Sequence, residues 1–194
     1  YMTYQISKEE AIRNAGCYMS ECGVDSIKLE GGRNVADTVR AIVNATIPVM
    51  GHIGLTPQSI SQLGGFRAQG RTVDSALALI EDAEALEEAG VFATLVEAVP
   101  PPVAKIITER SSVPIISLGS GPDCDGSCLI VHDMVGFFER FVPKFVKKYC
   151  NVAEIVTAAM KEYVADVRAG RFPGPEHTYS MLKEERPRFD AWVK

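Results

Sequence analysis

The sequence predicts an α/β fold built around a parallel sheet. Apolar segments of about five to eight residues alternate with amphipathic segments of about ten residues or more, as strands and helices do in β/α proteins. The expected strands are apolar on both faces, which is typical of a parallel sheet covered by helices. Two junctions recur: helices end in Cys-Gly at 22–23 and Ala-Gly at 89–90, and Ile-Pro at 47–48 and Val-Pro at 113–114 begin strands. Such repeated units favour a (β/α)8 TIM barrel over an open sheet.

Helices are expected where apolar residues are spaced three or four apart. The first begins at a capping box formed by Ser7 and Glu10 and ends at Gly23, which suits the left-handed position after a helix. A long amphipathic helix has its apolar residues between 73 and 86 and ends at Gly90. The further expected helices cover residues 35–45, 101–110, 143–149 and 152–169.

Strands are expected in the short apolar segments between these helices, at residues 25–29, 47–53, 92–99, 113–118 and 129–132. A complete barrel needs eight strands and typically about 250 residues, and the chain has 194. Residues 1–180 are therefore expected to form a partial barrel that lacks roughly three βα units, followed by a polar tail at 181–194. Because an open sheet leaves unpaired strand edges, we expect the stable particle to contain those units, joined upstream or bound as a separate piece.

The composition narrows the class of protein. A net charge of −5 and a pI near 5.3 argue against a nucleic-acid-binding surface. No apolar run approaches the roughly 20 residues that span a bilayer, so neither nucleic acid nor membrane is an expected partner. The five cysteines show no regular spacing, which favours a reducing, cytoplasmic compartment, or a mitochondrial one in a eukaryote. Cys124 and Cys128 form a single C-x3-C, which is weak support for zinc and is better explained by turns or strand edges.

Polar residues end four of the expected strands: Lys28 and Glu30, then His52, Glu97, and Ser117 with Ser120. Catalytic side chains of a barrel lie at these carboxyl ends, and a charge there is costly unless it is paired or used. Each residue also has a structural interpretation: Lys28 and Glu30 as an ion pair, His52 as a core histidine, Glu97 as the partner of a loop cation. Because these polar residues converge on one rim of the predicted barrel, a functional site is favoured over separate structural roles.

Four motifs in order resemble one known family: IKLEGG at 27–32, PVMGHIGLTPQSISQLGGFRAQGR at 48–71, LVEAVP at 95–100 and FPGPEH at 172–177. They resemble the ketopantoate hydroxymethyltransferase (3-methyl-2-oxobutanoate hydroxymethyltransferase) family, with residues 1 to about 180 matching its C-terminal two-thirds. The resemblance implies a (β/α)8 barrel of the phosphoenolpyruvate/pyruvate type that here lacks roughly the first three βα units. It also implies transfer of a hydroxymethyl group from 5,10-methylenetetrahydrofolate to 2-oxoisovalerate, giving ketopantoate for pantothenate and coenzyme A biosynthesis.

The resemblance also implies roles for individual residues. Glu97 matches the general base, Lys28 and His52 match substrate-binding residues, and Glu30 matches a residue of the divalent metal site, which usually holds Mg²⁺. The family's two aspartate metal ligands have no counterpart in this sequence. Since Mg²⁺ requires several oxygen ligands, Glu30 alone would not hold it, and the 194 residues alone are expected to show little activity. A ring-like, decamer-like homo-oligomer is the implied assembly.

Two alternatives remain beside the transferase. One is a metal-dependent lyase or aldolase of the isocitrate lyase type, which also enolises 2-oxo acids on a barrel rim. The other is an inactive, truncated chain that serves as a structural subunit. The motifs at 50–59 and 64–71 favour the transferase over the lyase.

Overall fold

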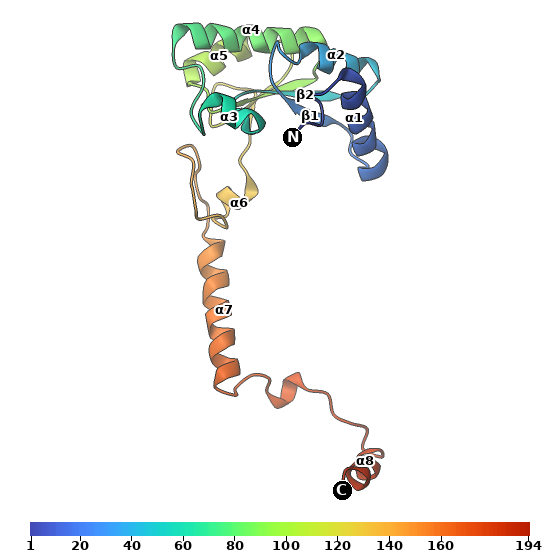
Figure 1. Cartoon of the computed structure of the whole chain (residues 1–194). Helices are drawn as coiled ribbons and strands as arrows, with labels where there is room; N and C mark the ends of the chain where they lie inside the picture. The colour runs from blue at the N-terminus through green and yellow to red at the C-terminus, as the bar shows by residue number, and fades with distance from the viewer. The chain divides into compact units, whose positions relative to one another are not determined.

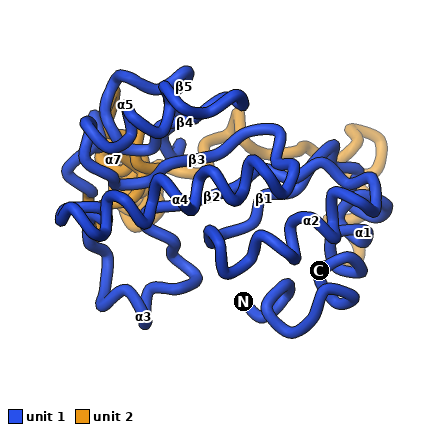
Figure 2. The backbone as a smooth tube through the Cα atoms, turned by 90° about the horizontal axis from the view of Figure 1, so that it is seen from above, with its two compact units in different colours: residues 1–131, 143–147 blue, residues 132–142, 148–194 orange.

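The computed structural model describes residues 1–194, which form two compact units. Unit 1 contains residues 1–131 and 143–147, and unit 2 contains residues 132–142 and 148–194 (Figure 2). All five strands belong to unit 1, so the candidate residues at the strand ends also lie there.

The sheet of unit 1 has five parallel strands in chain order: β1 Ile27–Glu30, β2 Val49–Gly54, β3 Ala93–Glu97, β4 Ile115–Leu118 and β5 Gly126–Ser127. Strands that are neighbours in the chain are neighbours in the sheet, so the order does not reverse as it does in a doubly wound fold. The predicted parallel α/β class is confirmed. Closure into an eight-stranded barrel stays a prediction.

Helices precede β1 and connect the first four strands. Those of unit 1 are α1 Lys8–Cys22, α2 Ala36–Asn44, the short η1 Pro57–Ser59 and α3 Ile60–Leu63, α4 Val73–Ala89 and α5 Pro101–Arg110 (Figure 1). A short helix, α6 Val131–Met134, begins at the boundary between the units, and unit 2 contains α7 Val152–Arg168, η2 Pro175–His177 and α8 Arg186–Trp192. None of these helices has the length and apolar character needed to cross a membrane.

The helix ends agree in part with the capping signals in the sequence. The Ser7 side chain accepts a hydrogen bond from the Glu10 amide (3.2 Å), but the Glu10 carboxylate pairs with Arg13 (2.8 Å). The predicted reciprocal capping box is therefore only half formed. Gly90 ends α4 with a φ of 97°, a conformation that suits glycine, as the sequence predicts.

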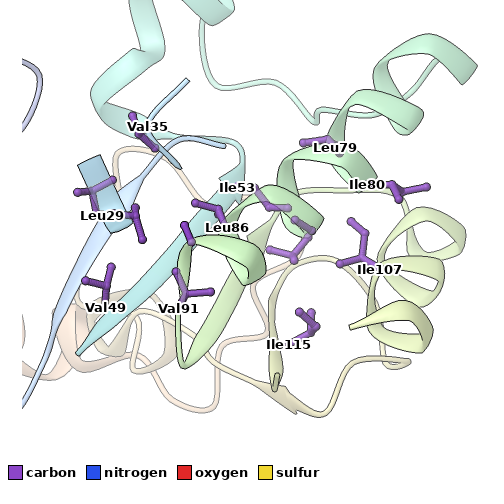
Figure 3. Packing of buried hydrophobic residues seen from close by; sticks show 14 of the residues in the cluster. Leu29, Val35, Val49, Ile53, Leu79, Ile80, Leu86, Val91, Ile107 and Ile115 are labelled. Atoms are coloured by element: carbon purple, nitrogen blue, oxygen red, sulfur yellow. The ribbon is translucent and has the colours of Figure 1, made fainter. Parts of the chain in front are cut away.

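The apolar core lies between one face of the sheet and helices α2, α4 and α5 (Figure 3). Its central members come from both layers: Leu29, Ile53, Val96 and Ile115 from the strands, and Val39, Ile42, Leu86 and Ile107 from the helices. Gly51 allows α4 to pack closely on β2, because a Cβ atom there would lie 2.8 Å from Leu86 Cδ1. The opposite face of β1–β3 does not contribute side chains to this core.

Two predicted elements are wrong. Residues 129–132 do not form a strand, because the fifth strand ends at Ser127 and the chain turns into α6 at Val131. Residues 143–149 do not form a helix, because the Tyr149 amide donates to the Met134 carbonyl (2.8 Å) instead of to a carbonyl four residues back. The aromatic residues between 137 and 149 therefore do not share a helix.

Glu87, near the end of α4, anchors the loop before β4. Its carboxylate accepts hydrogen bonds from the Ser111 hydroxyl (2.7 Å) and from the amide (3.1 Å) and hydroxyl of Ser112. These contacts, with the Ser112 side chain first, hold the pKa of Glu87 below its ordinary value, although burial opposes the shift.

We expect Glu87→Gln to reduce the pH dependence of stability in the acid range. A carboxylate whose pKa is lower in the folded state stabilises the protein above its unfolded pKa, and this contribution is lost as the pH falls through the folded pKa. The variant should be less stable than wild type at pH 7, and the difference should shrink between about pH 5 and pH 3. Thermal unfolding across this pH range measures the difference in stability between the variant and wild type, with Glu88→Gln on the exposed side of α4 as control. A constant difference at all pH values would contradict the assignment.

Candidate functional site

The strand register brings Glu30, His52 and Glu97 together. Glu30 pairs with His52 across β1 and β2, and Gly54 pairs with Glu97 across β2 and β3. Because side chains alternate along a strand, these three side chains share the face of the sheet opposite the apolar core. The sequence predicted this convergence from the positions of the residues at the strand ends.

His52 lies between the two carboxylates. Its Nε2 atom is 3.1 Å from Glu97 Oε2, and its Nδ1 atom is 3.7 Å from Glu30 Oε1. The His52 side chain is 2% exposed, and the side chains of Glu30 and Glu97 are each 12% exposed. Neither ring nitrogen has a hydrogen-bond partner of good geometry. Buried polar atoms are nearly always hydrogen-bonded in folded proteins, so the two ring nitrogens of His52 are unusual for a core histidine.

Glu30 is fixed by contacts from outside its own strand. Its Oε2 atom accepts a hydrogen bond from the Gln58 amide (2.9 Å), and its carbonyl accepts one from the Tyr4 hydroxyl (2.9 Å). Burial, and then the negative charge of Glu30, raise the pKa of Tyr4. The sequence did not predict that Gln58 and Tyr4 contact Glu30. Neither a backbone amide in a loop nor a tyrosine near the N-terminus belongs to a sequence pattern that indicates contact with β1.

The backbone around Glu97 is closely held. The Glu97 carbonyl accepts a hydrogen bond from the Leu55 amide (2.8 Å), and the Ala98 amide donates to Leu118 (2.9 Å). A Cβ atom at Gly54 would lie 2.3 Å from the Glu97 carbonyl oxygen, so only glycine allows this approach. Ala98 adopts a φ of 51°, an uncommon conformation for a residue other than glycine. The chain therefore turns sharply directly after Glu97.

Lys28 lies on the same face of β1 as Glu30, but its side chain is exposed and forms no ion pair with Glu30. The Lys28 ammonium acts electrostatically on the thiol of Cys128, directly after β5. Burial raises the pKa of Cys128, the Lys28 ammonium opposes this shift, and the Glu97 carboxylate adds to it. Lys28 and Glu97, on two different strands, are thus both within electrostatic range of this one thiol. Sequence reasoning missed Cys128 as a neighbour of the site.

Ser117 and Ser120, the polar residues at the end of β4, do not join this cluster. Ser117 pairs with Val96 in the register, which turns it to the core side of the sheet. Both serines are buried, and the Ser117 hydroxyl accepts a hydrogen bond from the Ser120 amide (3.0 Å).

The residues of this chain do not by themselves fit a magnesium ion. No group of three or more His, Cys, Asp or Glu side chains is arranged to hold a metal. One oxygen of Glu30 is already engaged by the Gln58 amide, and the other faces the imidazole of His52. Mg²⁺ requires an octahedral set of oxygen ligands, which Glu30 alone cannot supply.

Comparison with known proteins shows similarity along nearly the whole chain. The family model described as ketopantoate hydroxymethyltransferase matches residues 1–175. A 3-methyl-2-oxobutanoate hydroxymethyltransferase of Alkaliphilus metalliredigens is 58% identical over 180 residues, covering 93% of this chain and 64% of the relative. One of Syntrophomonas wolfei is 51% identical over 184 residues, covering 95% and 67%. The chain thus spans about two thirds of the length of these curated relatives.

Among solved structures, a crystal structure of phosphonopyruvate hydrolase matches with a TM-score of 0.51 and 13% identity, covering 98% of this chain and 67% of that chain. A second, of the same protein in complex with oxalate and Mg²⁺, matches with a TM-score of 0.50 at the same identity, covering 98% and 68%. At this identity the likeness concerns the fold alone.

We expect the rate at which Cys128 is alkylated to depend on the charges of Glu97 and Lys28. Glu97→Gln removes a negative charge, so the thiol pKa should fall and alkylation by iodoacetamide should become about twofold faster or more at mildly alkaline pH. Lys28→Met should have the opposite effect. Peptide mass spectrometry measures the rate at Cys128, and the exposed Cys17 on α1 serves as internal control. Equal rates in both variants would contradict this geometry.

Proposed function

We propose, from the premise that this chain belongs to the ketopantoate hydroxymethyltransferase family, that it carries the proton-abstracting residues of a hydroxymethyltransferase site. The reaction would convert 2-oxoisovalerate, 5,10-methylenetetrahydrofolate and water into ketopantoate and tetrahydrofolate. The observation that carries the proposal is the buried, unsatisfied imidazole of His52 between Glu97 and Glu30. The motifs that resemble the family contain all three of these residues.

Glu97 is proposed as the base. A hydrogen on C3 of 2-oxoisovalerate, next to the ketone, must be removed before that carbon can form a new bond. The C–H bond breaks, its proton passes to the Glu97 carboxylate, and the electron pair moves between C2 and C3 to give an enolate. The Glu97 side chain is only 12% exposed, so its carboxylate is partly shielded from water, which favours proton abstraction. The enolate carbon then bonds to the one-carbon unit as one carbon–nitrogen bond of the folate breaks. Water supplies the hydroxyl as the second carbon–nitrogen bond breaks, and protonation of the nitrogens gives tetrahydrofolate.

His52 and Lys28 are proposed to bind the substrate. The Nε2 atom of His52, 3.1 Å from Glu97, helps to orient the base, and the other ring nitrogen is available to a substrate oxygen. The Lys28 ammonium has no carboxylate partner in the chain, and it lies within electrostatic range of the same thiol as Glu97. It would therefore stabilise the negative charge that develops on the enolate oxygen.

The divalent metal, Mg²⁺, is proposed from family membership, with Glu30 as the contribution of this chain. Bound metal would supply electrophilic stabilisation of the enolate. Because the residues present do not complete such a site, no step described above depends on it.

A closed (β/α)8 barrel and a ring-like homo-oligomer are proposed as the setting of this site. The sequential parallel strand order and the likeness to phosphonopyruvate hydrolase support the barrel. Turnover of 2-oxoisovalerate that requires the methylenetetrahydrofolate co-substrate would support the transferase over a lyase. Substrate cleavage without folate would favour the lyase, and a lack of turnover would favour a structural subunit.

Glu97→Gln is expected to slow proton exchange at C3 of 2-oxoisovalerate by about 10²–10⁴-fold, because the amide cannot accept the proton. Binding of 2-oxoisovalerate should be retained, since the variant is nearly isosteric. Deuterium exchange followed by NMR measures the rate, and Glu109→Gln on the exposed side of α5 is a matched control. Exchange at a rate near that of wild type would rule Glu97 out as the base.

Lys28→Met keeps much of the side-chain volume and removes the charge. We expect weaker substrate binding together with slower exchange, and a loss in kcat/KM of about tenfold or more, because the ammonium interacts with both the bound carboxylate and the enolate. Steady-state kinetics measure the loss, with Lys105→Met on α5 as control. Unchanged kinetics would make Lys28 a structural residue.

A further inference from the structure

The hydroxyl of Ser120 holds the chain on both sides of Glu97. It donates a hydrogen bond to the carbonyl of Val96 (2.8 Å), the residue before Glu97, and accepts one from the amide of Val99 (3.1 Å), two residues after it. Ser120 is 1% exposed, so both hydrogen bonds are shielded from water. One side chain thus spans the turn on which Glu97 lies without being part of the cluster around His52.

The turn needs such support because its conformation is costly. Ala98, between Glu97 and Val99, has a φ of 51°, and a non-glycine residue keeps this conformation only where its surroundings impose it. Without the hydroxyl, the buried Val99 amide would lose the partner it has in the structure. The turn would then relax toward ordinary φ values, and the Glu97 side chain at the end of β3 would point in a different direction.

We propose that Ser120 is a positioning residue that aims the Glu97 carboxylate at His52 and the substrate. Its own orientation is fixed because its amide donates to the Ser117 hydroxyl (3.0 Å). The proposal rests on the proposed role of Glu97 as the base. Ser120 does not touch the substrate and acts on Glu97 only through the conformation of the turn.

A matched control exists at the opposite end of β4. The Ser111 hydroxyl also accepts a hydrogen bond from a backbone amide, that of Val113 (3.2 Å), and its one hydrogen is shared between the Glu87 carboxylate (2.7 Å) and the Val113 carbonyl (3.0 Å). Ser111→Ala removes comparable hydrogen bonds from the same part of the chain but lies away from Glu97. It therefore shows what loss of stability alone does to the site.

The first measurement compares proton exchange at C3 of 2-oxoisovalerate in Ser120→Ala, Ser111→Ala and wild type. We expect Ser120→Ala to slow exchange at saturating substrate by about tenfold and to leave half-saturation within about twofold, because misaligning a base affects the transition state more than substrate binding. Ser111→Ala should lower the melting temperature and leave the exchange rate unchanged. Equal rates in Ser120→Ala and wild type, or equal slowing in both variants, would overturn the proposal.

The second measurement does not depend on activity. The ¹⁵N NMR signal of His52 Nε2, identified by its absence in His52→Gln, reports the contact of this nitrogen with Glu97. It should shift in Ser120→Ala toward its position in Glu97→Gln, and stay in place in Ser111→Ala. If wild type exchanges no proton, the proposed function fails, and this signal decides the role of Ser120. A shift confined to Ser120→Ala supports the positioning role, and no shift overturns it.

Should Ser120→Ala fail to fold, Ser120→Cys takes its place. A thiol is a weaker hydrogen-bond donor and acceptor than a hydroxyl and leaves no cavity, so the support of the turn weakens while the buried volume is kept. The comparison is again with wild type and Ser111→Ala, and the same outcomes decide.

Discussion

The candidate site depends on the close parallel packing of β2 against its neighbours. Two glycines make it possible: Gly51 lets α4 approach the sheet on the core side, and Gly54 lets the carbonyl of Glu97 come near β2. A side chain at position 54 would meet the backbone of β3, and one at position 51 would displace the Leu86 side chain. Because the strands keep this register, His52 lies beside Glu30 on one side and within 3.1 Å of Glu97 on the other. The fold thereby brings together residues that are up to 67 positions apart in the chain.

The two faces of the sheet carry opposite physical properties. One face buries branched apolar side chains against α2, α4 and α5, which stabilises the fold through the loss of apolar surface from water. The other face carries Lys28, Glu30, His52 and Glu97 at the carboxyl ends of the strands. Burying charged and polar groups costs free energy unless they are paired, and the His52 nitrogens are not satisfied within the chain. This cost is consistent with a site whose polar groups are completed by a ligand.

Sequence patterns identified elements best where they were long and bounded by clear signals. The helix ending at Gly90 and the helix beginning at Pro101 were both identified, because a left-handed glycine and prolines in the first turn are local signals. The fifth strand was misplaced because the apolar residues 129–132 resemble a strand as well as they resemble α6. The expected helix at 143–149 failed because backbone hydrogen bonds to residues near 134 replaced those within a helix.

The sequence by itself determined the parallel α/β class, the family, and the group formed by Glu30, His52 and Glu97, because strand ends and motifs are local patterns. Only the tertiary structure decided that Ser117 faces the core, that Cys128 lies near Lys28 and Glu97, and that Ser120 supports the turn at Ala98. The reason is physical. These arrangements depend on strand register and on contacts between side chains and distant backbone groups, and neither the face of a strand nor the partner of a buried hydroxyl is encoded by neighbouring residues alone.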